Sequence, residues 1–131
     1  MIIKIKPFFL RLITGHRQWV AFTPCVYHPW GIDPQQYPEV IAHEAVHLAR
    51  QEALGRWLWY LRYCVSPSFR VDEEVLAIVA QLEALPESRH FSVVNYYANA
   101  LSGRLYWWAT SYAAATAAIE AGYRNRNRSA A

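Results

Sequence analysis

Residues 38–54 read PEVIAHEAVHLARQEAL, and this segment decides how the chain folds. Proline suits the first position of a helix, where its missing N–H is no loss, and Glu39 suits the positively polarised first turn. Gly55 follows directly, and glycine is the residue type that most often ends a helix. The apolar residues form one stripe that we expect to face the core, namely Ile41, Ala45 and Leu48. The segment therefore predicts a helix that ends near Leu54.

This helix carries two histidines, His43 and His47, with Glu44 between them. Residues four apart lie on one face of a helix, so both imidazoles can converge on one tetrahedral Zn²⁺ at about 2.0–2.1 Å. Glu44 points beside the metal, where it can take a proton from metal-bound water. The H-E-x-x-H spacing thus predicts a zinc hydrolase. The alternative is a pair of ordinary histidines beside a solvated glutamate.

A catalytic zinc ion needs a third protein ligand and an open position for water. Position 53 is alanine, which excludes the metzincin pattern of a third histidine six residues after His47. Glu73 and Glu74 lie on a further predicted helix at residues 71–85. Neighbours on a helix diverge by about 100°, so only one of the two can face the metal. Both also suit the ordinary role of acids in a first helical turn.

Glu74-Val75-Leu76-Ala77 resembles the E-x-x-A pattern that supplies the third zinc ligand in several gluzincins. With residues 59–70, WYLRYCVSPSFR, it resembles short phage and prophage proteins described as metallopeptidases. The resemblance spans roughly residues 38–80 and implies Glu74 as the ligand and Glu73 as its neighbour. Larger gluzincins support a ligand histidine with an aspartate where this chain has Ile78. A backbone carbonyl or Glu73 could take that role here.

The rest of the chain predicts an α+β, zincin-like fold, with a small N-terminal antiparallel sheet followed by four or five helices. Strands are predicted at residues 2–5, 10–13 and 18–27, with a bulge or strand end at Pro24. Further helices are predicted at residues 56–64, 71–85, 92–102 and 105–121. We expect one domain over residues 1–122 and a polar, flexible tail over residues 123–131. A strand edge would offer an extended peptide a place to lie.

The composition limits the classes of partner. The 131 residues are 54% hydrophobic and carry a net charge of +3, which fits one globular domain without a nucleic-acid footprint. No stretch approaches the roughly 18 uncharged apolar residues of a membrane span. The expected partners are a peptide or protein substrate and, given the resemblance, a viral or phage protein. We expect the protein in the cytoplasm of a host bacterium or associated with a virion.

Hydrolysis of an amide also needs a hydrogen-bond donor for the oxyanion. Tyr106 is the preferred candidate, ahead of Tyr112, Tyr96 and His90, although tyrosines on apolar helices usually belong to the core. The resulting hypothesis is a peptidase with one Zn²⁺ per chain, held by His43, His47 and Glu74, with Glu44 as general base. Two alternatives stay open. One is a non-catalytic zincin-fold structural or binding module, for example a phage particle component, and the other is a zinc amidase acting on cell wall.

Overall fold

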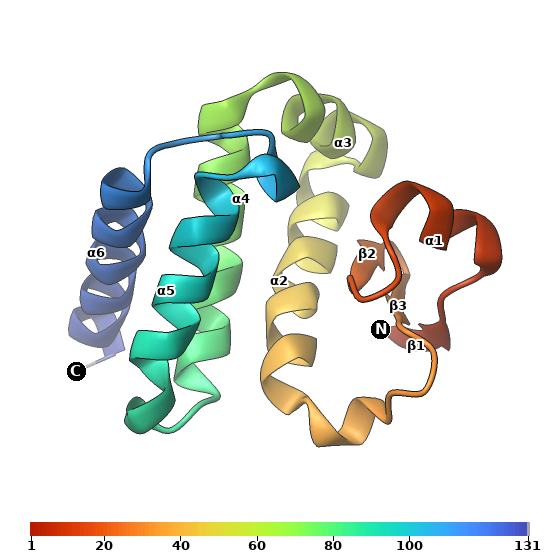
Figure 1. The fold of residues 1–131 in the computed structure, drawn as a ribbon, viewed down its shortest axis with the longest axis horizontal. Helices are drawn as coiled ribbons and strands as arrows, with labels where there is room; N and C mark the ends of the chain where they lie inside the picture. The colour runs from red at the N-terminus through yellow and green to blue at the C-terminus, as the bar shows by residue number, and fades with distance from the viewer. Residues whose placement is uncertain (131) are drawn as a thin grey trace.

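The computed structural model describes residues 1–130, in which a small three-stranded sheet stands beside a group of α-helices (Figure 1). The strands are β1 (Ile2–Ile5), β2 (Val20–Phe22) and β3 (Cys25–His28). The helices are α1 (Phe8–Thr14), α2 (Pro38–Leu54), α3 (Arg56–Val65), α4 (Pro67–Glu83), α5 (His90–Leu101) and α6 (Tyr112–Ala130). Short 3₁₀ turns are η1 (Pro34–Gln36), η2 (Glu87–Arg89) and η3 (Arg104–Tyr106). The α+β class is confirmed, and five α-helices follow the sheet within these residues.

The sheet is mixed, so the expected antiparallel sheet was wrong. The central strand β3 pairs with β2 in antiparallel fashion, with Val20 opposite Tyr27, and with β1 in parallel fashion, with Ile2 opposite Cys25. Residues 10–13, expected as a strand, belong to α1, because a short apolar run fits either type of element. The expected strand at residues 18–27 is the β2–β3 hairpin.

The helix at residues 38–54 is confirmed, and its end at Gly55 has a φ of 82°, which favours glycine. The helix expected at residues 56–64 is α3, with the same start. The helix expected at residues 71–85 starts earlier, because α4 begins at Pro67, where the Ser66 hydroxyl accepts from the Phe69 N–H at 3.3 Å. The last expected helix began too early. Trp107 and Trp108 have φ values of 54° and 51°, outside the range of an α-helix.

Helix α6 runs through residues 123–130, which the sequence analysis assigned to a flexible tail, while residue 131 of that tail lies outside the described residues. The Arg126 guanidinium donates to the Glu83 carboxylate of α4 at 3.2 Å, so this part of α6 contacts the helical body. No helix within residues 1–130 combines the length and apolarity needed to cross a bilayer.

Two separate apolar clusters form the core. The larger joins α4, α5 and α6 through the buried residues Ile78, Leu82, Val93, Ala98, Leu101, Ala115 and Ile119. The smaller joins the sheet to α2 through Ala21, Val26 and Leu48. Helix α2 lies between the sheet and helices α4, α5 and α6 (Figure 1). Its buried face therefore connects the two clusters.

Candidate metal site

The face of α2 that points into the protein is polar. Positions 39, 43, 47 and 51 are one turn apart and are all buried as Glu39, His43, His47 and Gln51. The expected apolar stripe is only partly right, because Leu48 is buried whereas Ile41 and Ala45 are half-buried. Buried polar groups are costly without partners, so the partners of this polar stripe define the site.

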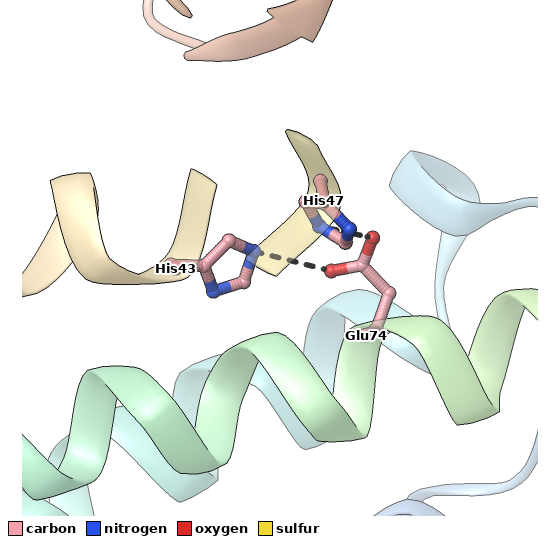
Figure 2. A group of neighbouring side chains, drawn as sticks. All are labelled: His43, His47 and Glu74. Carbon is pink, nitrogen blue, oxygen red and sulfur yellow. Dashed lines mark ion pairs between the residues drawn. The ribbon is translucent and has the colours of Figure 1, made fainter. Parts of the chain in front are cut away.

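His43 and His47 project from α2 toward Glu74, which comes from the neighbouring helix α4 (Figure 2). The Nε2 atom of His43 is 3.5 Å from one Glu74 carboxylate oxygen, and the Nε2 atom of His47 is 3.4 Å from the other. The three ligand atoms lie within 4.8 Å of one another, and all three residues are buried. This group can hold a metal ion.

The spacing and the hydrogen bonding both fit a cation. Two ligands at 2.0–2.1 Å from a tetrahedral ion are about 3.4 Å apart, close to the observed separations between nitrogen and oxygen. The Glu74 Oε2 atom is buried and has no hydrogen-bond partner within residues 1–130. Buried polar atoms nearly always have partners, so an unpaired carboxylate oxygen beside two imidazoles points to a missing positive charge.

Glu74 is fixed by Tyr63 of α3, whose hydroxyl donates to its Oε1 at 2.5 Å. Burial raises the pKa of Glu74, but the nearby His47 and His43 outweigh burial and hold that pKa well below its usual range. Burial lowers the pKa of His47, and Glu74 more than reverses this, so the net direction is upward. The carboxylate is thus ionised, as a metal ligand must be.

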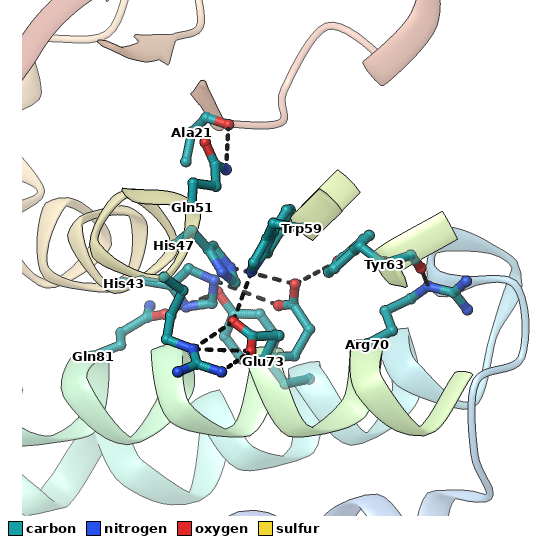
Figure 3. Close-up of polar contacts among 12 residues, drawn as sticks. Ala21, His43, His47, Gln51, Trp59, Tyr63, Arg70, Glu73 and Gln81 are labelled. Atoms are coloured by element: carbon teal, nitrogen blue, oxygen red, sulfur yellow. Dashed lines mark hydrogen bonds and ion pairs between the residues drawn. The ribbon is translucent and has the colours of Figure 1, made fainter. Parts of the chain in front are cut away.

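Glu73 points elsewhere, as expected for a neighbour of the ligand (Figure 3). It accepts from the Arg50 guanidinium at 2.7 Å and from the Trp59 indole N–H at 2.8 Å. The Trp59 ring lies edge-on against the imidazole of His47, with 5.5 Å between ring centroids. Glu73 therefore supports His47 indirectly, by holding the indole that packs on it.

His43 has a hydrogen-bonded support from α5. The Tyr97 hydroxyl donates to Gln81 Oε1 at 2.8 Å, so its oxygen is free to accept from His43 Nδ1–H, 3.4 Å away. With the hydrogen on Nδ1, the Nε2 lone pair faces the Glu74 oxygen. A cation between these two atoms turns a repulsive contact into an attractive one. Tyr97 therefore takes, toward His43, the hydrogen-bonding role that the sequence left to a backbone carbonyl or Glu73.

Removal of this support should weaken metal binding. We expect Tyr97→Phe to lower zinc affinity by about 10- to 100-fold, because His43 loses the acceptor that fixes its tautomer. Competition with a chromogenic chelator measures the affinity. The matched control is Tyr96→Phe, since Tyr96 is 54% exposed on the same helix. Equal affinities for the two variants would contradict the supporting role of Tyr97.

Glu44 is buried beside the ligand group without belonging to it. Burial raises the pKa of its carboxyl, while the adjacent His43 and His47 act in the opposite direction. The negative charge of Glu74 also raises this pKa, which means that the two carboxylates share one electrostatic environment. The charges of His43, His47 and Glu74 therefore all act on the Glu44 carboxyl.

Tyr106 lies on η3 and packs against the larger apolar cluster. Burial raises the pKa of its phenol well above the usual value, and Glu74 adds to this shift. Tyr106 therefore stays a candidate for the oxyanion donor. The other tyrosine and histidine candidates lie elsewhere: Tyr96 is exposed, Tyr112 donates to Asn95 at 2.9 Å, and His90 contacts the Leu85 carbonyl at 3.1 Å.

The outer edge of β2 is occupied by side chains, so an extended peptide cannot add to the sheet there. Gln51 of α2 donates to the Ala21 carbonyl at 3.1 Å and accepts from the Thr23 N–H at 3.0 Å (Figure 3). Tyr60 also donates to Ala21 O, at 2.5 Å, and burial raises its pKa to about 12. Between Ala21 and Thr23, this edge is therefore paired with side chains and closed to a strand.

Four residues around the site were not predicted from the sequence, namely Tyr97, Gln81, Tyr63 and Gln51. One signal was available for Tyr97, because Val93, Tyr97 and Leu101 are four residues apart and form the inward stripe of α5. Gln51 likewise continues the spacing of His43 and His47. The chain matches no family model, and it matches neither a curated protein nor a solved structure.

Proposed function

We propose that the protein is a zinc-dependent hydrolase and that its substrate is a peptide. The observation that carries the proposal is the convergence of two imidazoles from α2 and one carboxylate from α4. A second buried carboxylate, Glu44, lies next to this group and is not part of it. Three protein ligands leave one coordination position for water, the arrangement of catalytic rather than structural zinc sites. Because Glu44 is not a metal ligand and follows His43 directly, it suits the role of general base.

In amide hydrolysis, each residue of the site would have a separate role. Zinc, when bound, lowers the pKa of water and polarises a carbonyl oxygen. Glu44 takes a proton from the attacking water as the new C–O bond forms, and later gives that proton to the leaving amine as the C–N bond breaks. The Tyr106 phenol donates a hydrogen bond to the oxygen that becomes negative. Tyr63 and Tyr97 keep Glu74 and His43 in place throughout.

Zinc content tests the metal site. Purified protein should contain about one zinc ion per chain, and Glu74→Gln should lose most of it, because an amide is a weak ligand for zinc. Glu73→Gln is the matched control, since it changes the neighbouring carboxylate and retains an acceptor for Trp59. Elemental analysis after dialysis gives the stoichiometry. If Glu73→Gln loses zinc and Glu74→Gln retains it, the third ligand is Glu73 and the assignment to Glu74 is wrong.

A metal-stabilised structural module is the second candidate, and the burial of all three ligands favours it. A structural site is closed, and its metal contributes directly to folding. Chelation should then lower the melting temperature while the zinc-loaded protein cleaves neither fluorescent casein nor a mixed peptide library. Zinc-dependent cleavage of either probe decides for the hydrolase. A cell-wall amide as substrate and an origin in a phage stay predictions.

A further inference from the structure

Helix α1 projects from the protein without a partner. None of its seven residues is buried, and a helix this short is unstable in water on its own. Four of its large apolar side chains are exposed by 62% to 79%, and Trp30 is exposed by 69%. We call these five residues the N-terminal apolar face: Phe8, Phe9, Leu12, Ile13 and Trp30. An exposed apolar face of this kind marks a docking surface.

The base of α1 is nevertheless firmly held. Lys6 is fully buried, and its ammonium donates to Thr14 Oγ1 at 3.1 Å, to Gly15 O at 2.8 Å and to Gln18 O at 2.5 Å. The Arg11 guanidinium lies 4.6 Å from the centre of the Trp30 ring, which joins the two parts of the face. Figure 1 places α1 at the end of the molecule opposite α6. The face is therefore presented outward on a fixed base.

The charge within residues 1–32 is of one sign. Residues 1–32 contain four lysine or arginine residues and no aspartate or glutamate, and the first acidic residue is Asp33. Lys6 is occupied inside the protein, whereas Lys4 and Arg17 are exposed. Apolar and aromatic side chains flanked by free basic ones match a bilayer with anionic headgroups, which offers both an acyl boundary and negative charge.

We propose that the N-terminal apolar face docks the protein onto an anionic lipid surface. A second copy is the competing occupant, and the charges disfavour it. Two such faces in contact would bring the basic groups of both copies together, with no acid among residues 1–32 to neutralise them. Pairing through the edge strand β1 would likewise align Lys4 of each copy. The proposal concerns attachment to a surface and does not depend on the function of the metal site.

Vesicle flotation tests this proposal. Full-length protein is mixed with vesicles of phosphatidylcholine alone or with phosphatidylserine added, at low and high salt. We expect binding to the anionic vesicles only, weakened by salt because the basic residues contribute. Phe9→Ala with Leu12→Ala should reduce the bound fraction about tenfold. The control pair is Phe91→Ala with Leu61→Ala, which removes the same two residue types from exposed positions on α5 and α3. That pair should bind like the wild type.

Three results would overturn the proposal. The first is that folded wild-type protein, verified by circular dichroism, does not float with anionic vesicles. The second is an equal loss of binding in both pairs of variants, which would mean unspecific adsorption. The third is a dimer of the wild type in light scattering that Phe9→Ala with Leu12→Ala makes monomeric without any change in vesicle binding. That last result assigns the face to a second copy.

Discussion

Glu44→Gln should retain its zinc ion and lose peptide hydrolysis by about 10²- to 10⁴-fold. Glutamine keeps the size of the side chain but cannot accept the proton of the attacking water. The ligand group does not include Glu44, so the metal content should stay near one ion per chain. Initial rates on fluorescent casein, or on the best peptide from a mixed library, give the effect on kcat/KM.

The matched control for this variant is Glu52→Gln, an exposed carboxylate on the same helix. It makes the same chemical change on α2 and should alter neither the rate nor the metal content. An active Glu44→Gln protein would remove the general-base role while leaving the metal site intact. Loss of zinc from Glu44→Gln would instead make Glu44 a fourth ligand, and the site would then be structural.

Arg70→Met should lower the free energy of unfolding by about 3 kcal/mol or more, a large share of the 5–15 kcal/mol typical of a small domain. Arg70 is 2% exposed, and its guanidinium donates to three backbone carbonyls: Tyr63 at 2.9 Å, Cys64 at 2.9 Å and Tyr106 at 3.2 Å. Tyr63 stands four residues before Pro67, which has no N–H, so its carbonyl has no helical donor.

Urea unfolding monitored by circular dichroism measures this effect. Arg89→Met is the control, because Arg89 is exposed on η2, and its loss should change stability by less than about 0.5 kcal/mol. Arg70→Lys should resemble Arg70→Met, since a single ammonium cannot reproduce the planar fork that reaches three carbonyls. An Arg70→Met protein as stable as the control would mean that water replaces the guanidinium.

Arg70 also shows what one sequence can and cannot predict. Its place one turn before Glu74 favours an ion pair, yet within residues 1–130 its hydrogen-bond acceptors are carbonyls and its guanidinium lies over the Trp107 ring. Helix α2 and the shared face of His43 and His47 follow from local spacing and capping, whereas the resemblance to the E-x-x-A pattern implied Glu74; the structure brings all three together. One acceptor of Arg70, the Tyr106 carbonyl, and the acceptor of His43, the Tyr97 hydroxyl, come from η3 and α5, far along the chain. Spacing within one helix carries no information about them.

The polar stripe of α2 explains why the expected apolar stripe of this helix was only partly right. Periodicity identifies a core face by its apolar residues, so it gives no sign that Gln51 and Glu39 are buried, as they are. The mixed sheet was missed for a related reason. The run Leu10 to Ile13 is apolar enough for a strand, and only the parallel pairing of β1 with β3 requires a crossover there.

The hydrogen bonds of Lys6 to Thr14, Gly15 and Gln18 fix the base of the segment that carries α1, independently of the residues at its tip. The ammonium closes the base of the excursion that carries α1, so the sequence of its tip is not needed to complete the sheet or the metal site. Substitutions at Phe8, Phe9, Leu12 or Ile13 can therefore accumulate, or be selected, without a stability penalty. The proposed docking face can therefore change in sequence while the buried Lys6 keeps the segment that carries it in place.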